Sequence, residues 1–374
     1  MSLLDPYVAD LAGLAARDRL RALRPREGVD FASNDYLALS TSPRLAAAVG
    51  EAIARGVPVG SGGSRLLRGN DAEHEVLEAE AAAFFGSEAT LSFASGFQAN
   101  LTLFGTLPQR GDLVIYDELI HASAHEGMRL GRADRVVAAH NDPQAFEDAI
   151  LRWRRAGGTG RPWIAVESLY SMDGDRAPLD ELAALAERYE GFLLVDEAHA
   201  TGVFGPDGRG LAAGLEGRET VVTLRTCGKA LGVEGALICL PASLRDFIVN
   251  RGRGFIFSTA PSPLMAAAIR ESLRILADEP DRRARLWTLV ATAERALGPC
   301  GVEPTGSQIL PLVLGEDGAA MRVAGALQAA GLDVRGIRPP TVPAGTARLR
   351  ISLTLNAGEA DVARLAEVLA GALR

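Results

Sequence analysis

Short, continuously apolar segments alternate with helical patterns through the middle of the chain, and this alternation constrains the fold more than any other feature. The segments expected to be strands are 90–93, 113–116, 163–167, 192–196, 221–224 and 236–240. Strands that are apolar throughout are typical of a parallel sheet that is covered on both faces. The pattern therefore predicts an α/β fold with a mostly parallel sheet and helices on both of its faces.

The chain is expected to form more than one domain, because 374 residues exceed what one hydrophobic core usually supports. A helix is predicted over 5–24, where apolar residues recur at helical spacing. After Pro263 the pattern changes to long helices and a few strands. We expect an N-terminal helix and arm over 1–45, a large domain over 46–265 and a smaller C-terminal α+β domain over 266–374.

The charge balance and the distribution of apolar residues exclude several classes of protein. There are 39 Lys and Arg against 47 Asp and Glu, so the net charge of −8 argues against a general nucleic-acid or anionic-membrane binder. No stretch has the composition of a secretory signal or a membrane span. The 3 cysteines without CxxC spacing fit a reducing compartment and no metal site. We expect a cytoplasmic protein.

The chain contains a single lysine, Lys229, beside 38 arginines. Arginine can replace lysine wherever only positive charge is needed, but its guanidinium stays protonated and is a poor nucleophile. The remaining lysine is therefore a candidate for Schiff-base or proton-transfer chemistry. The alternative is that Lys229 is an accidental survivor of a drift toward arginine.

The sequence VDEAH at 195–199 follows an expected strand and resembles an ATPase motif. An ATPase also needs a phosphate loop of the form Gly-x-x-x-x-Gly-Lys-Ser/Thr. The only lysine lies in TLRTCGKA, where Thr223 replaces the first glycine and Ala230 replaces the hydroxyl residue. The ATPase hypothesis is therefore rejected.

Three chemical groups follow expected strands: the carboxylate of Asp196, the imidazole of His199 and the amine of Lys229. Ligands of open parallel sheets bind at the carboxyl ends of the strands. This set suits pyridoxal phosphate, because an amine holds its aldehyde and a carboxylate pairs with its pyridinium nitrogen. The alternative is a helix cap at Asp196 and a surface histidine.

Three other motifs are weaker evidence for a function when each is taken alone. SGFQAN at 95–100 follows a strand and opens a helix, so the amides around Gly96 and Phe97 could bind phosphate. GSGGSR at 60–65 is more typical of a linker than of a loop over an anionic substrate. His121 and His125 have neither the intervening Glu nor a third ligand of a metal site, which leaves ring stacking or general-acid chemistry for His121.

Taken together, these motifs resemble the α-oxoamine synthases, pyridoxal-phosphate enzymes of fold type I. The resemblance covers nearly the whole chain and rests on SNDYL at 33–37, GSGGSR, SGFQAN, HAS at 121–123, HND at 140–142, SMDGD at 171–175, VDEAHATGVFG at 195–205, TCGKALG at 226–232, FIFSTA at 255–260 and IRPPTVPAGTARLRISL at 337–353. The run from Arg338 favours the branch of biotin synthesis, which joins L-alanine to a pimeloyl thioester. Its acyl carrier would be coenzyme A or acyl carrier protein.

The resemblance implies roles for residues at the cofactor. Lys229 would hold the aldehyde as an imine and move the α-proton of the substrate. Asp196 would pair with the pyridinium nitrogen, His199 would hydrogen-bond the ring oxygen, and His121 would stack on the ring. The other implied cofactor contacts are Ser171, Thr226 and the amides of Gly96 and Phe97.

The resemblance also implies contacts to the substrates and to a second subunit. Arg350 would clamp the carboxylate of alanine, and its guanidinium geometry suits this task. Arg24, Asn34 and Thr341 match positions that contact substrate. Thr259 matches a residue that reaches the phosphate in the neighbouring subunit, which implies a homodimer with the active site at the subunit interface.

Three residues depart from the family pattern: Ile120 stands before the histidine, Glu234 lies in the loop after the lysine, and Arg225 precedes Thr226 as a phosphate-binding or structural cation. Rival hypotheses are another α-oxoamine synthase, similar to glycine C-acetyltransferase, or an aminotransferase or lyase of the same fold. A third is a non-catalytic protein that kept the fold. The role of Cys227, beside the lysine, is most simply that of a small buried residue.

Overall fold

A computed structural model describes residues 2–374 and divides into two compact units. Unit 1 comprises the chain up to Tyr36, Met172–Asp175 and Ala284–Arg374, and unit 2 comprises Leu37–Ser171 and Arg176–Arg283. These bounds differ from the predicted domains at 1–45, 46–265 and 266–374. In particular, α10 (Pro263–Asp278) belongs to unit 2, because it packs against helices of that unit.

Unit 2 contains a seven-stranded sheet. Across the sheet the strands are β2 (Ala89–Phe93), β8 (Ala236–Leu240), β7 (Val221–Thr226), β6 (Phe192–Asp196), β5 (Pro162–Glu167), β3 (Leu113–Asp117) and β4 (Asp134–Ala138). The strands from β7 to β4 are parallel, and β8 is antiparallel to both of its neighbours. All six expected strands are present, and the predicted mostly parallel α/β sheet is confirmed. Edge strand β4 was not predicted, because its sequence is largely exposed and polar at its start.

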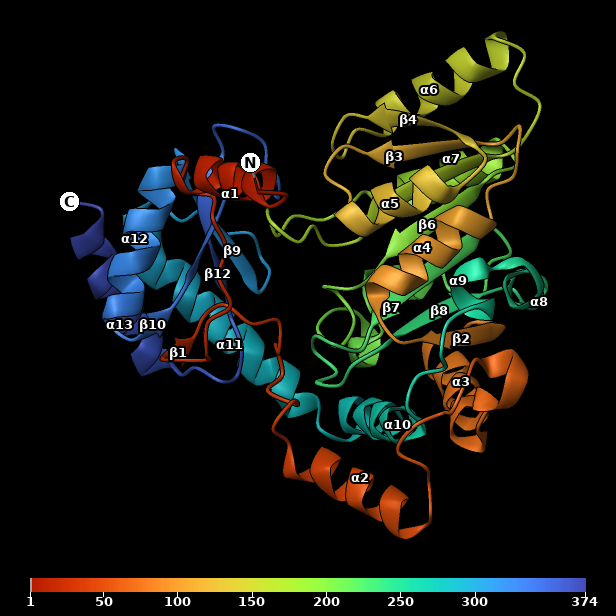
Figure 1. Cartoon of the computed structure of the whole chain (residues 1–374), viewed down its shortest axis with the longest axis horizontal. Coiled ribbons are helices and arrows are strands. Elements are labelled where there is room, and N and C mark those ends of the chain that lie inside the picture. Colours follow the sequence, from red (N-terminus) through yellow and green to blue (C-terminus); the bar gives the residue numbers. More distant parts are fainter. Residues whose placement is uncertain (1) are drawn as a thin grey trace. The chain divides into compact units, whose positions relative to one another are not determined.

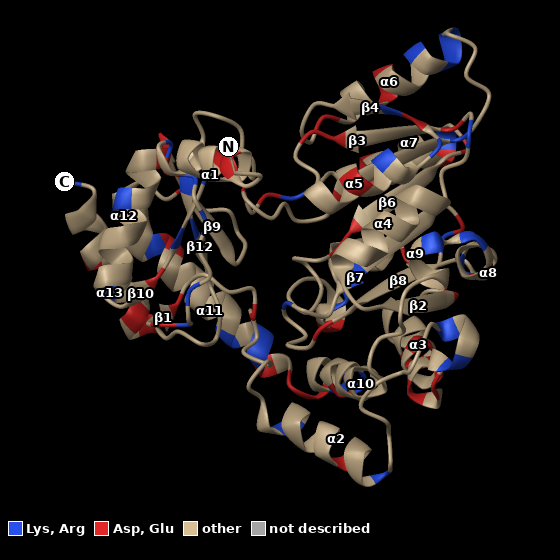
Figure 2. Cartoon of the chain, in the orientation of Figure 1, with Lys and Arg blue, Asp and Glu red and all other residues tan. Residues whose placement is uncertain are grey.

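Helices cover both faces of this sheet (Figure 1). One core combines α4 (Gly96–Thr106) and α5 (Ala122–Leu130) with the sheet, and the other combines α6 (Pro143–Arg155) and α7 (Leu179–Arg188) with it. The remaining helices of unit 2 are α2 (Pro43–Ala54), α3 (Ala72–Phe85), α8 (Ala242–Arg251), α9 (Arg253–Ile256) and α10. Figure 2 shows that the charged residues of this unit lie mainly on its helices and loops.

Unit 1 is built on a three-stranded antiparallel sheet in the order β11 (Arg335–Ile337), β12 (Ala347–Ser352) and β9 (Ile309–Gly315). A short parallel pair joins β1 (Val29–Asp30) to β10 (Leu332–Asp333). Its helices are α1 (Asp5–Ala15), most of α11 (Pro280–Leu297), α12 (Asp317–Ala329) and α13 (Glu359–Ala372). These elements match the expected α+β character of the C-terminal part.

The N-terminal helix is shorter than predicted. It ends at Ala15, and Asp18 then takes a left-handed conformation with φ 55°. The expected helix over 5–24 is therefore wrong beyond residue 15. The following segment is irregular and is attached to α12 by an ion pair of Arg19 with Asp317 at 2.6 Å and a hydrogen bond of Arg24 to Gln328 at 3.1 Å. These tertiary contacts replace the helical hydrogen bonds that the periodicity suggested.

None of the helices formed by residues 2–374 combines the length and the apolar content needed to span a bilayer.

Candidate active site

Three parallel strands of unit 2 end side by side and place polar groups at one edge of the sheet. Glu167 ends β5, Asp196 ends β6 and Thr226 ends β7. In the strand register Glu167 lies opposite Asp196, and Asp196 lies opposite Leu224. The edge therefore has the position that parallel sheets use for ligands.

The amine of Lys229 and the imidazole of His199 meet at this edge, with 2.7 Å between Nζ and Nε2. Lys229 lies in the turn from β7 into the antiparallel strand β8, and His199 is buried in the turn after β6. The lysine turn depends on Gly232, whose φ is +67° and at which a Cβ would lie 2.5 Å from the backbone of Leu39 and Ser40. The fold thus brings together two of the three groups predicted from sequence.

Asp196 is held by two hydrogen bonds. Its Oδ2 accepts from Asn100 Nδ2 at 2.9 Å, and its Oδ1 accepts from the amide of Ala198 at 2.9 Å. The Asn100 amide also donates to Ser123 Oγ at 2.9 Å, and Ser123 Oγ lies 2.7 Å from Nδ1 of His121. A polar chain across α4 and α5 therefore links His121 to Asp196 and fixes the orientation of the carboxylate.

Two ionisable groups at the edge have shifted pKa values. Desolvation and the nearby Lys229 lower the pKa of His121 and outweigh the opposing effect of Asp196, so its imidazole is neutral near pH 7. Burial, reinforced by the charge of Asp196, raises the pKa of Glu167 to about 8. Glu167 Oε2 accepts the amide of Ser171 at 3.1 Å. When Glu167 is protonated, no second negative charge lies beside the carboxylate of Asp196.

The start of α4 forms a second feature of the edge. Ser95 caps this helix and accepts from the amide of Gln98 at 3.2 Å. A Cβ placed on Gly96 would lie 3.7 Å from Oγ1 of Thr226, so the first helical turn and this hydroxyl are neighbours. Helix-terminal amides beside a hydroxyl favour an anion such as phosphate. The exposed Phe97 lies in the same turn.

Unit 1 contributes a separate set of candidate residues. Arg350 on β12 is buried, and its guanidinium donates to Ser352 Oγ at 2.6 Å, to Asn34 Oδ1 at 3.0 Å and to the hydroxyl of Tyr36 at 3.3 Å. Arg350 and Ser352 share a face because side chains alternate along a strand. Two of the predicted substrate residues, Asn34 and Arg350, are therefore in direct contact.

Three further predicted residues lie apart from these contacts. Arg24 is exposed on the N-terminal arm, and Thr341 is exposed in the turn before β12. Thr259 is exposed between α9 and α10, and its hydroxyl makes no hydrogen bond to residues 2–374. No contact within either unit joins these three to the clusters described above.

The structure also accounts for the departures from the family pattern. Ile120 packs into the core under α4 and α5, and Glu234 is exposed. Arg225 is fully buried, stacks on Phe85 and forms ion pairs with Glu197 and Glu216, so it is a structural cation. Burial raises the pKa of the Cys227 thiol, which makes it unreactive.

Sequence reasoning missed Asn100 and Glu167 as members of the site. Asn100 is the last residue of the quoted SGFQAN motif, and a buried amide in a helix was the available signal. Glu167 ends a strand that was predicted, but its carboxylate was counted as part of an apolar run. Residues 2–374 form no group of three His, Cys, Asp or Glu side chains that could hold a metal ion.

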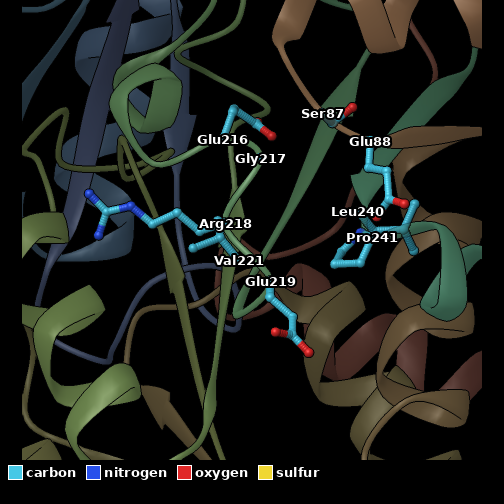
Figure 3. A pocket seen from close by; sticks show the side chains of 9 residues that line it. All are labelled: Ser87, Glu88, Glu216, Gly217, Arg218, Glu219, Val221, Leu240 and Pro241. Atoms are coloured by element: carbon cyan, nitrogen blue, oxygen red, sulfur yellow. The ribbon is translucent and has the colours of Figure 1, made fainter.

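A hollow of about 250 Å³ lies at the opposite end of β7 (Figure 3). It is lined by Ser87, Glu88, Glu216, Gly217, Arg218, Glu219, Val221, Leu240 and Pro241. Two of its carboxylates serve the fold, since Glu216 accepts from Thr223 at 2.6 Å and Glu88 accepts the amide of Ala242 at 3.0 Å. This hollow is therefore distinct from the candidate site.

The residues at the sheet edge fit pyridoxal phosphate. The cofactor needs an amine for its aldehyde, a carboxylate for its ring nitrogen and an anion site for its phosphate. Lys229, the oriented Asp196 and the start of α4 with Thr226 supply these groups within one unit.

Comparisons with known proteins agree with this chemistry. The family model described as aminotransferase class I and II matches residues 26–369. The 8-amino-7-oxononanoate synthase of Anaeromyxobacter dehalogenans is 41% identical over 99% of this chain and 96% of its own length. The enzyme of that name from Burkholderia thailandensis is 45% identical over 92% of this chain and 88% of its own.

Two solved structures show the same fold. Serine palmitoyltransferase of Sphingomonas wittichii gives a TM-score of 0.87 at 30% identity, covering 100% of this chain and 98% of that one. The 8-amino-7-oxononanoate synthase of Francisella tularensis gives 0.77 at 26% identity, covering 92% and 98%. The chain belongs to the class I and II aminotransferase family and has the fold of the fold-type I pyridoxal-phosphate transferases. Within that family, its curated relatives at 41% to 45% identity are 8-amino-7-oxononanoate synthases.

Proposed function

We propose that this protein condenses L-alanine with a pimeloyl thioester to give 8-amino-7-oxononanoate, carbon dioxide and a free thiol, a step of biotin biosynthesis. The observation that carries the proposal is the placement of the only lysine 2.7 Å from His199, at the sheet edge that also holds Asp196. An amine in that position is the group that this decarboxylative condensation requires.

Pyridoxal phosphate, when bound, supplies an electron sink for negative charge at the α-carbon of the amino acid. Lys229 Nζ would hold the cofactor aldehyde, and its free amine would take the α-proton of the substrate and later return a proton. The other residues that would hold the cofactor are Asp196 at the ring nitrogen, His199 at the ring oxygen, His121 at the ring face, and Ser171, Thr226, Gly96 and Phe97 through polar contacts.

Asp196 must remain an anion to pair with the ring nitrogen. Asn100 and the amide of Ala198 both donate to it and hold its two oxygens in place. His121 is neutral, so its ring can lie against a cationic heterocycle without repelling it. These residues orient the cofactor and leave Lys229 as the base.

Arg350 would bind the carboxylate of alanine with both guanidinium nitrogens. Its hydrogen bonds to Ser352 and Asn34, both neutral acceptors, hold the plane of the guanidinium. Arg24 and Thr341 would contact the acyl substrate.

The protein would act in the cytoplasm as a homodimer, with Thr259 reaching the phosphate in the neighbouring subunit. This proposal is supported by the exposure of Thr259 and by the reducing compartment that its free cysteines fit. The acyl chain would be carried by coenzyme A or by acyl carrier protein. Neither nucleic acid nor a membrane is expected as a partner, given the net charge of −8.

A panel of amino acids and acyl thioesters tests the proposal, with release of carbon dioxide and of thiol both measured. Alanine with a pimeloyl thioester should release both in equal amounts. Preference for glycine or serine would instead indicate another α-oxoamine synthase, a possibility that the likeness to serine palmitoyltransferase keeps open. Amino transfer without thiol would indicate an aminotransferase and would contradict the proposal.

A further inference from the structure

His74, on α3 of unit 2, is a fully buried histidine to which the proposed function gives no role. Its Nδ1 lies 3.1 Å from the amide nitrogen of Asp71, and its Nε2 lies 2.8 Å from the carbonyl oxygen of Pro261. A backbone amide can only donate a hydrogen bond, and a carbonyl oxygen can only accept one. Nδ1 is therefore the acceptor and Nε2 carries the proton, so a neutral ring uses both of its nitrogens.

The two contacts of His74 differ in what they join. The bond from Asp71 belongs to a capping box at the start of α3 and is local. The bond to Pro261 joins residues that are 187 positions apart, and it reaches the segment between α9 and α10. Burial, together with the charge of Arg65, lowers the pKa of His74, so the ring keeps this neutral form near pH 7.

The segment between α9 and α10 is also bonded to the glycine-rich loop at 60–65 and to the residue before it. Three hydrogen bonds join the two: Ser61 Oγ to the carbonyl of Pro261 at 2.5 Å, the amide of Ala260 to the carbonyl of Gly63 at 2.9 Å, and Ser262 Oγ to the carbonyl of Val59 at 2.6 Å. The carbonyl of Pro261 therefore accepts from two side chains. The glycine-rich loop is held in place and is not a free linker.

Thr259 stands at the start of this bonded segment. Thr259 is exposed, whereas the next residue, Ala260, is buried. The turn at Arg65–Gly69 packs against α9. Four large apolar side chains in and beside these segments are each more than half exposed: Val59, Leu66, Leu67 and Phe257. Exposed apolar side chains that gather in one region are typical of a surface that another protein covers, which agrees with the second subunit of the proposed function.

We infer that His74 is a positioning residue for the cofactor site of the neighbouring subunit: through the carbonyl of Pro261, it fixes the segment from which Thr259 reaches the cofactor phosphate. This inference rests on the proposed function, which supplies the role of Thr259. A segment that is already held by hydrogen bonds loses less conformational entropy when its ligand binds. Release of the segment from His74 should therefore weaken the binding of pyridoxal phosphate without removing a group that touches it.

Two substitutions separate the two contacts of His74. In His74→Gln, the side-chain amide offers one acceptor and one donor, so it can replace both ring nitrogens. In His74→Asn, the shorter amide can still accept from Asp71 but ends short of Pro261. The dissociation constant for pyridoxal phosphate, measured by spectroscopic titration of the dimer, should rise about 3- to 10-fold in His74→Asn, the range for one lost hydrogen bond. It should stay close to the wild-type value in His74→Gln.

Asp71→Ala is the matched control for the helix cap. It removes the carboxylate that accepts the amide of Glu73 at 2.9 Å and leaves the contact of His74 with Pro261 in place. Asp71→Ala should bind pyridoxal phosphate as the wild type does, and thermal unfolding checks that each variant is folded. An equal loss of affinity in Asp71→Ala and His74→Asn would show that His74 acts only through the stability of α3, which would contradict the inference.

Mixed dimers show in which subunit His74 acts. Each mixed dimer contains one Lys229→Ala subunit, so only one site can hold the cofactor covalently, and intact mass after borohydride treatment measures its occupancy. A wild-type subunit paired with the double variant His74→Asn, Lys229→Ala should need about 3- to 10-fold more pyridoxal phosphate for half occupancy. A His74→Asn subunit paired with Lys229→Ala should need no more than the wild type, because its site receives Thr259 from an intact segment.

Three further results would overturn the inference: unchanged cofactor affinity in His74→Asn, a loss of affinity that follows the subunit carrying Lys229, and a monomeric wild-type protein in analytical ultracentrifugation. The failure of the proposed function would look different. If the wild-type enzyme released no thiol with any donor, the proposed reaction would be wrong, while the titrations and the mixed dimers would still report on the role of His74.

Discussion

The polar groups at the sheet edge of unit 2 and two arginines of unit 1, Arg338 and Arg350, are held by different kinds of partner. At the edge, Lys229 contacts His199, and Asp196 accepts from Asn100. Each reactive group is therefore oriented by a partner from the same unit, at the ends of rigid strands. Chemistry on a cofactor needs such fixed positions, because proton transfer depends on the placement of individual atoms.

In unit 1, Arg350 and Arg338 contact neutral groups, whereas Arg19 and Arg348 pair with carboxylates. Arg350 donates to oxygens of Asn34, Tyr36 and Ser352, and Arg338 contacts a thioether. These contacts orient the two guanidinium groups. On the proposed function, unit 2 would carry the catalytic groups and unit 1 would carry Arg350, which would bind the carboxylate of alanine.

The largest effect should come from Lys229→Ala. Loss of the only lysine amine removes both the covalent hold on the cofactor and the base, so kcat should fall by about 10²- to 10⁴-fold or more. Thiol release measures the rate, and the mass of the protein after borohydride treatment measures the covalent adduct. Lys229→Arg, which retains the charge, should be equally impaired. A normal rate in either variant would place the chemistry elsewhere.

Arg350→Lys should act on recognition and not on the chemical step. Loss of the two-pronged contact should raise KM for alanine about 10- to 100-fold with a smaller change in kcat. Steady-state kinetics at saturating acyl donor measures both. Arg348→Lys is the matched control, since Arg348 lies on the same face of β12 but pairs with Asp173. An equal rise of KM for alanine in both variants would contradict the assignment of Arg350 to the carboxylate of alanine.

Ser352→Ala tests how Arg350 is oriented, and its effect should be smaller. The variant removes one neutral acceptor that orients Arg350, so KM for alanine should rise about 2- to 10-fold. Combining it with Arg350→Lys should produce less than the product of the separate effects, because both act through one contact. Full additivity, measured by a double-mutant cycle, would show that Ser352 does not position Arg350.

Glu167→Gln should change the pH dependence of stability by a small amount. Since the pKa of Glu167 is raised to about 8 in the folded protein, its stabilising contribution is present below pH 4.5 and is lost as pH rises toward 8. The neutral glutamine lacks this dependence. The thermal unfolding midpoint of the variant, relative to that of the wild type, should therefore rise between pH 5 and pH 8.

Thermal unfolding of the holoenzymes at several pH values measures this trend. Glu234→Gln, which changes an exposed carboxylate in the lysine turn, should follow the wild-type curve. Parallel curves for wild type and Glu167→Gln would show that Glu167 is already ionised in the folded protein.

Much of unit 2 could be predicted from its sequence. The strands that end at Asp196 and Thr226 are continuously apolar, and burial on both faces gives them that composition. The prediction was wrong at the N-terminus, where residues 16–24 have helical spacing but are held to α12 by Arg19 and Arg24. Periodicity reports only on residues near in sequence, and these partners are about 300 positions away.

The amino-acid sequence by itself determined the strand and helix order of the large sheet and the identity of the reactive amine, because both depend on local patterns and on side-chain chemistry. The tertiary structure alone decided which neutral groups orient Arg350, that Asn100 fixes Asp196, and that Arg338 is buried beside a thioether. Each of these contacts joins residues from distant parts of the chain, whose proximity depends on how the strands and helices pack and not on any local pattern.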